Sequence, residues 1–159
     1  MNNEPHLIML AGLPCAGKST FVKKFLDEEP EHYGILSSDN IIDVLAAANH
    51  ITHDEAFRKY DFKEIMRIFN ITLKSFIEKD SNIIWDQTNC TLKTRRKKLR
   101  RIPDHYHKTL YFFQTPLEEC LKRNTREGKI IPQHVMENMN EHLVLTDEDY
   151  EIFDEIIMM

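Results

Sequence analysis

The sequence predicts an α/β protein in which a five-stranded, mainly parallel sheet lies between two layers of helices. Two observations lead to this prediction. Short apolar segments typical of buried strands alternate along the chain with longer segments of helical periodicity. A glycine-rich turn joins the first strand directly to the first helix. With 159 residues and no repeat, linker or low-complexity tract, the chain is expected to form one domain, residues 1–159.

The strands and helices can be placed in order along the chain. The expected strands cover residues 6–11, 33–38, 82–85, 108–114 and 152–158. The expected helices cover residues 19–28, 41–48, about 53–79, 92–101 and 116–126. The longest helix carries apolar residues at helical spacing, namely Phe62, Ile65, Met66, Phe69, Leu73 and Phe76. This stripe indicates a helix face packed on the sheet rather than a ligand groove.

The turn after the first strand is a complete phosphate-binding motif. Residues 12–19, GLPCAGKS, match the pattern GxxxxGK[ST]. In this motif, backbone N–H groups and the positive end of a helix dipole hold a polyphosphate. A chance match on a surface loop is the alternative, but the flanking strand and helix argue against it. We therefore expect a P-loop NTPase-type three-layer sandwich that uses ATP and Mg²⁺.

The motif also assigns individual residues. Lys18 is expected to reach the β- and γ-phosphates, and the Ser19 hydroxyl to complete the Mg²⁺ shell. The residues expected to contact the nucleotide are Gly12, Leu13, Pro14, Cys15, Ala16, Gly17, Lys18, Ser19 and Thr20.

Two carboxylates follow predicted strands, where a parallel sheet places its ligands. Asp39 follows the second strand and Asp86 follows the third. A kinase needs one carboxylate to orient or deprotonate the acceptor hydroxyl and often another near the metal. Asp39 is a candidate base, but Ser38, Asp39 and Asn40 are also all suitable N-caps for the next helix. Asp86 is a candidate metal ligand, or else part of a turn.

A candidate lid follows the fourth strand. Arg123 and Arg126 are three residues apart, so on one helix they would share a face and could converge on phosphates. Gly128 fits a helix end and Pro132 the first turn of the next helix. Such a helical lid could close over ATP and exclude water, with Arg126 contacting the nucleotide. A solvent-exposed charged helix is the alternative.

A dense basic cluster follows Asn89. It comprises Lys93, Arg95, Arg96, Lys97, Lys98, Arg100 and Arg101. The chain carries a net charge of −5, but every Lys and Arg lies at or before Lys129 and eight acidic residues lie after it, so residues 1–129 carry +3. A track for a nucleic-acid backbone is one interpretation, with Asn89, Arg95 and Arg96 contacting the acceptor. An ordinary charged helix face is the other.

Composition indicates the cellular setting. The polar start Asn2-Asn3-Glu4 has no cationic lead and no long apolar run, so we expect an intracellular, cytoplasmic protein without a membrane segment. The cysteines Cys15, Cys90 and Cys120 are far apart and lack metal-ligand spacing. Neither a disulfide framework nor a zinc site is expected.

In this order, the phosphate loop, Asp39, the segment Asp86-Gln-Thr-Asn89 and the two lid arginines resemble the phage-type polynucleotide 5′-hydroxyl kinases. The resemblance runs from about Leu7 to the C-terminus. It implies that Asp39 is the general base, that Asp86 supports the metal or the base, and that Lys18, Arg123 and Arg126 act on the phosphates.

Two positions depart from that family. Its acceptor-steering arginine, three residues after the catalytic aspartate, is Ile42 here, and its second lid arginine is Glu127, one residue after Arg126. The segments around Gly12 and Asp86, with Arg95-Arg96-Lys97, are also similar to the kinase-like P-loop module of nuclear ribonucleoproteins.

These observations predict an ATP-dependent kinase that acts on a 5′-hydroxyl of DNA or RNA. Two alternatives stay open, a kinase of a small hydroxylated metabolite and a non-catalytic ATP- and RNA-binding module. A switch-type GTPase is disfavoured because the chain has no guanine-reading Asn-Lys-x-Asp element. The oligomeric state is not predicted.

Overall fold

The structure, a computed structural model, describes residues 4–159. The polar residues Asn2 and Asn3, on which the expectation of a leaderless start partly rests, lie outside that range. The strands are β1 (His6–Ala11), β2 (Tyr33–Leu36), β3 (Asn82–Asp86), β4 (His107–Phe112) and β5 (Glu155–Met158). The helices are α1 (Lys18–Glu28), α2 (Ser38–Ala48), α3 (His53–Lys59), α4 (Phe62–Glu78), α5 (Leu92–Leu99), α6 (Leu117–Arg123), α7 (Gln133–His142) and α8 (Asp149–Ile152).

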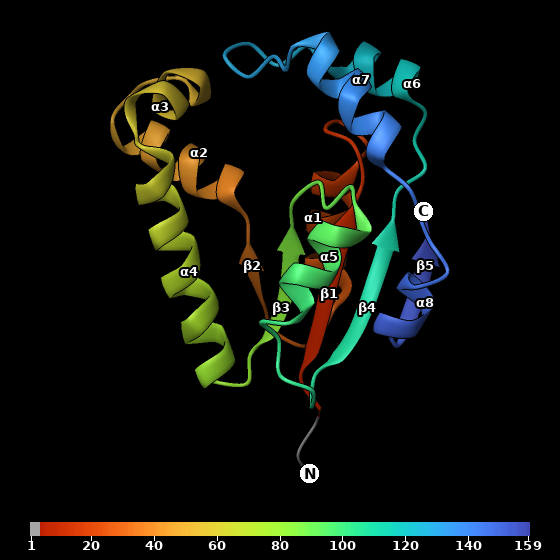
Figure 1. The fold of residues 1–159 in the computed structure, drawn as a ribbon. Coiled ribbons are helices and arrows are strands. Elements are labelled where there is room, and N and C mark those ends of the chain that lie inside the picture. The colour runs from red at the N-terminus through yellow and green to blue at the C-terminus, as the bar shows by residue number, and fades with distance from the viewer. Residues whose placement is uncertain (1–3) are drawn as a thin grey trace.

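The five strands form one sheet in the order β2-β3-β1-β4-β5, and every neighbouring pair is parallel. The α/β prediction is therefore confirmed. Leu10 near the end of β1 pairs with Asp86 at the end of β3. Because all strands run the same way, the loops that leave β1, β2 and β3 meet at one edge of the sheet (Figure 1).

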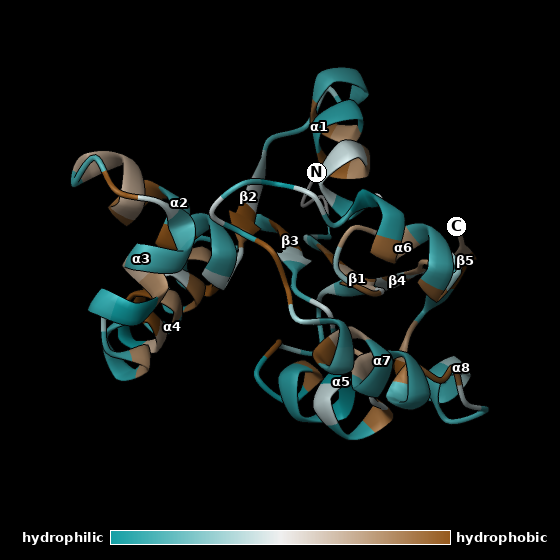
Figure 2. Ribbon diagram, turned by 90° about the horizontal axis from the view of Figure 1, so that it is seen from above, coloured by the Kyte–Doolittle hydropathy of each residue, from teal (hydrophilic) through white to brown (hydrophobic). Residues whose placement is uncertain are grey.

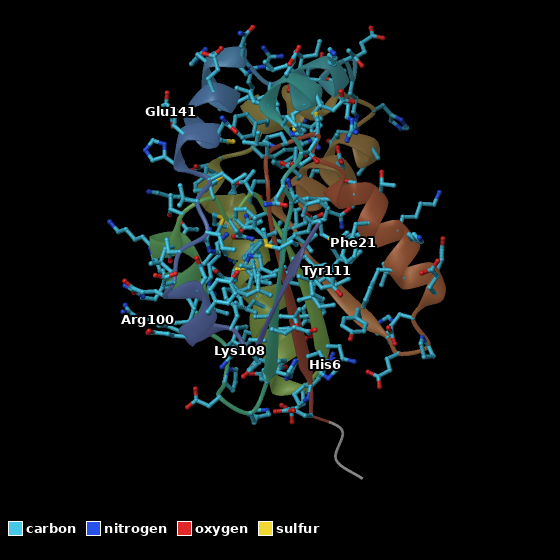
Figure 3. All side chains as sticks on the ribbon, turned by 90° about the vertical axis from the view of Figure 1, so that its right-hand side faces the viewer. His6, Phe21, Arg100, Lys108, Tyr111 and Glu141 are labelled. Atoms are coloured by element: carbon cyan, nitrogen blue, oxygen red, sulfur yellow. The ribbon has the colours of Figure 1, made fainter. Side chains whose placement is uncertain are left out.

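Helices cover both faces of the sheet, and the alternating residues of β1 supply both cores. Leu7 and Met9 pack in the cluster that contains residues of α4 and α5, whereas Ile8 and Leu10 pack in the cluster that contains residues of α1 and α6. Figure 3 looks along the sheet edge. It shows Phe21 of α1 beside Tyr111 of β4, with ring centroids 4.6 Å apart, and Arg100 on the other face.

The stretch predicted as one long helix is two helices. Tyr60 is extended between α3 and α4, and the Asp61 side chain caps α4 by accepting the Lys63 N–H at 3.0 Å. A capping aspartate can start a helix wherever the preceding backbone is extended. The periodic apolar stripe is correct for α4, but it does not show that a separate short helix precedes it.

Several other predicted boundaries also differ from those in the structure, among them the following. The second strand ends at Leu36, because Ser37 caps α2. The last strand begins at Glu155, because Ile152 belongs to α8. The predicted helix over 116–126 ends at Arg123.

A lid loop, residues 124–132, connects α6 to α7. The Asn124 amide donates to the Ile131 carbonyl at 2.7 Å, and its oxygen accepts the Ile131 N–H at 3.1 Å. This pair of bonds closes the base of the loop, so its tip projects from α6 toward α2 and α3 (Figure 2). Within residues 4–159, no helix is both long and apolar enough to span a membrane.

Candidate active site

The phosphate loop, residues 12–19, leads from the end of β1 into α1. Gly17 has a φ of +102°, in the left-handed region that favours glycine. The Gly12 N–H donates to the Thr88 carbonyl at 2.9 Å, which ties the phosphate loop to the loop that follows β3. The backbone geometry of a phosphate cradle is thus held from two neighbouring strands.

Lys18 begins α1 and lies over the phosphate loop. Its Nζ donates to the carbonyl oxygens of Gly12 at 2.8 Å and Leu13 at 2.6 Å. Burial lowers the pKa of Lys18, and the charge of Asp86 opposes that shift. Burial likewise raises the pKa of Asp86, and the charge of Lys18 opposes it. The charges of Lys18 and Asp86 therefore attract each other, near the carboxyl ends of β1 and β3.

Ser19 and Asp86 were predicted to hold Mg²⁺. Ser19 is exposed at the start of α1, and Asp86 is half-buried at the end of β3. In the described part of the chain, no group of three or more His, Cys, Asp or Glu side chains could enclose a metal. Mg²⁺ is often bound through one or two carboxylates, substrate phosphates and water. One hydroxyl and one carboxylate fit that mode, so both assignments stand as predictions.

Asp39 is not the cap of α2. The cap is Ser37, whose Oγ accepts the Asn40 N–H at 3.2 Å, and Asp39 lies within the first turn. Its side chain is 64% exposed. Lys129 Nζ lies 3.5 Å from one carboxylate oxygen, and His53 Nε2 lies 3.9 Å from the other. The competing capping role is therefore wrong, and Asp39 lies just after the carboxyl end of β2 with its carboxylate exposed.

The tip of the lid loop lies against the corner between α2 and α3. The Asp54 N–H donates to the Gly128 carbonyl at 2.9 Å. Gly128 has a φ of +73°, and a Cβ there would lie 2.8 Å from Thr52 Cβ. The loop therefore needs glycine at this contact, both for its backbone conformation and for its close approach.

The two lid arginines do not share a helix face, contrary to the prediction. Arg123 ends α6 and lies against the phosphate loop, with Nη1 3.4 Å from the Cys15 carbonyl oxygen. Arg126 lies on the lid loop beyond the helix, and its Nη2 is 3.3 Å from Asp43 on α2. One arginine is beside the phosphate loop and the other is beside Asp43 of α2.

Arg95 is not available to an acceptor. Its side chain is fully buried, and Nε and Nη2 each contact an oxygen of Asp149 at 2.7 Å. Its other hydrogen bonds go to the backbone carbonyls of Asn89, Cys90 and Val144. The prediction that it binds the acceptor is therefore wrong. Arg95 holds the loop after β3 in place.

The other two predicted acceptor residues are also engaged within the protein. Asn89 is buried, and its amide donates to the Leu10 carbonyl at 2.7 Å while its oxygen accepts from Lys98. Asn89 also lines the pocket between α5 and α7, so its acceptor role stays a prediction. Arg96 forms an ion pair with Glu148 and remains 39% exposed, so its acceptor role stays untested.

Sequence reasoning missed Lys98 as an individual. Its Nζ donates to Gln87 at 2.6 Å and lies 5.4 Å from the centroid of the Trp85 ring. Burial lowers the pKa of Lys98 to about 8. It lines a pocket of about 410 Å³ between the loop after β3, α5 and α7. The walls include Thr88, Thr91, Thr94, Asn138 and His142.

His53 was missed as well. Its ring Nδ1 lies 2.8 Å from Asp43, and its side chain is only 7% exposed. A signal was present, because Thr52 and Glu55 form a capping box that places His53 at the start of α3. That signal locates the helix, but it does not show which carboxylates the imidazole meets.

The geometry defines a class of protein. A phosphate loop between the first strand and helix, with an exposed carboxylate after the next strand, is a P-loop phosphotransferase arrangement. A family model described as an AAA domain matches residues 7–145. The family of this model is one of P-loop kinases, and the chain belongs to it.

Individual comparisons show related proteins. The chain is 32% identical over 139 residues to an L-seryl-tRNA(Sec) kinase of Methanococcus maripaludis, covering 85% of this chain and 51% of that protein. It thus spans about half the length of this curated relative. A chain in a structure of the Pnkp1/Rnl/Hen1 RNA repair complex superposes with a TM-score of 0.71 at 21% identity, over 97% of this chain and 48% of that one.

A shikimate kinase from Acinetobacter baumannii gives a TM-score of 0.59 at 16% identity, over 98% of this chain and 84% of that one. At these identities, the two solved structures are similar in fold alone.

Proposed function

We propose that this chain transfers the γ-phosphate of ATP to the 5′-hydroxyl of a DNA or RNA strand. The position of Asp39 is the observation that carries the proposal. Its carboxylate is exposed and does not cap α2. Asp39 follows β2 at the same edge of the sheet at which the phosphate loop follows β1. A non-catalytic binding module has no use for such a base.

In the proposed reaction, the acceptor oxygen forms a bond to the γ-phosphorus as the bond between that phosphorus and the β–γ bridging oxygen breaks. Asp39 takes the hydroxyl proton, and ADP leaves. Lys18 and Arg123 stabilise negative charge on the phosphates from beside the phosphate loop. Mg²⁺, held by Ser19 with the support of Asp86, would neutralise charge on the β- and γ-oxygens.

The surface of α5 supports a polynucleotide acceptor. Lys93, Lys97, Arg100 and Arg101 are all exposed on or just after this helix. Arg101 also donates to Asn70 of α4 at 2.8 Å, so the basic surface continues toward α4. Separated cations of this kind bind a phosphate backbone without reading bases.

The L-seryl-tRNA(Sec) kinase to which the chain is similar suggests a second candidate acceptor, a hydroxyl attached to a tRNA. Its name describes a kinase of seryl-tRNA, whose reactive hydroxyl is on an amino acid rather than at a 5′ end. The same base and phosphate loop would serve either hydroxyl, so the difference would lie in how the strand is placed.

The third candidate acceptor is a small hydroxylated metabolite, and two observations favour it. Ile42 is buried among Ala46, Ala56 and Ile65. Helix α2 therefore has no cation at the position where the phage-type polynucleotide kinases carry their acceptor-steering arginine. The pocket between α5 and α7 also has the volume of a small-ligand site.

A labelled phosphate-transfer assay separates these acceptors. Wild-type protein with γ-labelled ATP and Mg²⁺ is incubated with a 5′-hydroxyl oligonucleotide, the same oligonucleotide already bearing a 5′-phosphate, seryl-tRNA, and a panel of nucleosides, sugars and hydroxy acids. Lys18→Met is the inactive control. Label on the 5′-hydroxyl oligonucleotide alone supports the proposal. Label on seryl-tRNA or a small molecule, or on no acceptor, would contradict it.

A further inference from the structure

A buried histidine lies between the candidate base and a second carboxylate. His53 Nδ1 is 2.8 Å from Asp43 Oδ1, and Nε2 is 3.9 Å from Asp39 Oδ1. Both aspartates belong to α2, whereas His53 begins α3. The imidazole is nearly buried, and so these two neighbours, rather than bulk water, decide its orientation.

The short contact with Asp43 sets the roles of the two ring nitrogens. A carboxylate only accepts hydrogen bonds, so Nδ1 carries the proton that Asp43 accepts. Nε2 is then the nitrogen that faces Asp39, and it carries a second proton only when the ring is charged. Burial alone would raise the pKa of Asp43, but the hydrogen bond from His53 and the charges of Lys129 and Arg126 lower it overall. Asp43 is therefore a carboxylate that can hold this orientation.

The lid loop reaches both ends of this arrangement. Arg126 contacts Asp43 at 3.3 Å, and Lys129 contacts Asp39 at 3.5 Å. Between them, the Gly128 carbonyl accepts from the N–H of Asp54, the residue after His53. The charged groups shown around His53 are thus Asp39 and Asp43 from α2 and Arg126 and Lys129 from the loop.

We propose that His53 is a positioning residue for Asp39, held by Asp43, and that docking of the lid loop completes this network. The inference rests on the proposed function, in which Asp39 is the base. The fixed imidazole keeps the Asp39 carboxylate in the orientation in which it takes the acceptor proton, so losing the ring slows transfer without weakening ATP binding.

Two isosteric variants test the role of each ring nitrogen. In His53→Asn, the side-chain NH₂ lies near the position of Nδ1 and keeps the bond to Asp43 but offers nothing to Asp39. In His53→Gln, the NH₂ lies near the position of Nε2 and keeps only the Asp39 side. We expect His53→Asn to fold with the wild-type unfolding midpoint and to lose about tenfold to a hundredfold in kcat, as for a displaced catalytic group. Its KM for ATP stays unchanged.

His105→Asn is the matched control. The His105 Nε2 lies 2.7 Å from Asp80, and the NH₂ of the Asn variant lies near the position of Nδ1, so this variant breaks another histidine–aspartate pair, away from the candidate site. This variant keeps the wild-type kcat. If His53 only joins α2 to α3, His53→Asn also keeps the wild-type kcat, and the proposal is overturned. A wild-type protein that phosphorylates nothing in the acceptor assay refutes the proposed function instead, so the two failures are distinguishable.

Discussion

The phosphate loop and the corner formed by α2, α3 and the lid loop share one edge of the sheet, but they are built differently. The phosphate loop is eight consecutive residues whose backbone makes the site. The corner is assembled from side chains far apart in the sequence, including Asp39, His53 and Lys129. The phosphate loop, the proposed donor half, is therefore set by local sequence, whereas the corner, the proposed acceptor half, depends on how three segments pack. Substitutions in the two halves should have different consequences.

The largest expected effect comes from the acceptor half. Asp39→Asn removes the base but keeps the size of the side chain, and we expect kcat to fall by about 10² to 10⁴. ATP affinity, measured by fluorescence titration or calorimetry, should not fall, because within residues 4–159 no hydrogen bond or ion pair joins Asp39 to the phosphate loop. Equal turnover in the variant would remove Asp39 from the mechanism. A loss of ATP affinity would show that the two halves are not separate.

The second effect concerns the buried ion pair between Arg95 and Asp149, which holds the loop after β3. Arg95→Met leaves Asp149 charged, buried and without its partner, and breaking such a pair costs about 3–5 kcal/mol of unfolding free energy. Arg96→Ala, which breaks the surface pair with Glu148, should cost about 0–1 kcal/mol. Urea unfolding of both variants measures the difference. Similar losses would mean that Arg95 does not support the loop after β3.

The pH dependence of the Arg95 effect has a definite sign. Burial alone would raise the pKa of Asp149, but hydrogen bonds from Arg95 and Thr146 lower it in the folded protein. A group whose folded pKa is lowered stabilises the protein above its unfolded pKa, and that contribution is lost as pH falls through the folded value. The stability gap between wild type and Arg95→Met should therefore narrow in acid. A gap that widens there would contradict this account.

A smaller effect is expected where the lid loop meets the corner. Gly128→Ala puts a methyl group against Thr52 and an alanine at positive φ, at a cost of about 1–2 kcal/mol. If the docked loop is the active arrangement, kcat falls about fivefold to thirtyfold. ATP binding to the phosphate loop alone should change little. Stopped-flow transfer kinetics can measure this loss, and unchanged kinetics would show that docking of the loop is not needed.

The smallest effect is expected on the basic surface of α5. The double change Lys97→Ala with Arg100→Ala should raise KM for an oligonucleotide several-fold and leave kcat alone. The dependence of log affinity on log salt should become shallower by about one unit for each cation that contacts phosphate. The change Lys23→Ala with Lys24→Ala, on α1, is a control with equal loss of charge. An equal response to both pairs would indicate nonspecific attraction.

The sequence predicted the donor half better than the acceptor half, and the reason is physical. Residues 12–19 need only their neighbours to form a phosphate loop, so the motif predicts its place and shape. The charge cluster predicted a basic helix but not that Arg95 points inward to Asp149, because that pairing spans 54 residues. Arg126 was misplaced because α6 ends at Arg123, where the Asn124 bonds to Ile131 close the lid loop. His53 acquires its neighbours only once α2 and α3 pack together.

The most direct test is a crystal structure with a nonhydrolysable ATP analogue, Mg²⁺ and a short 5′-hydroxyl oligonucleotide. We expect the phosphates on the loop of residues 12–19, and the 5′-oxygen within about 2.6–3.2 Å of an Asp39 carboxylate oxygen. His53 should lie against the other side of Asp39. A 5′-oxygen bound away from Asp39, for example in the pocket between α5 and α7, would contradict the account.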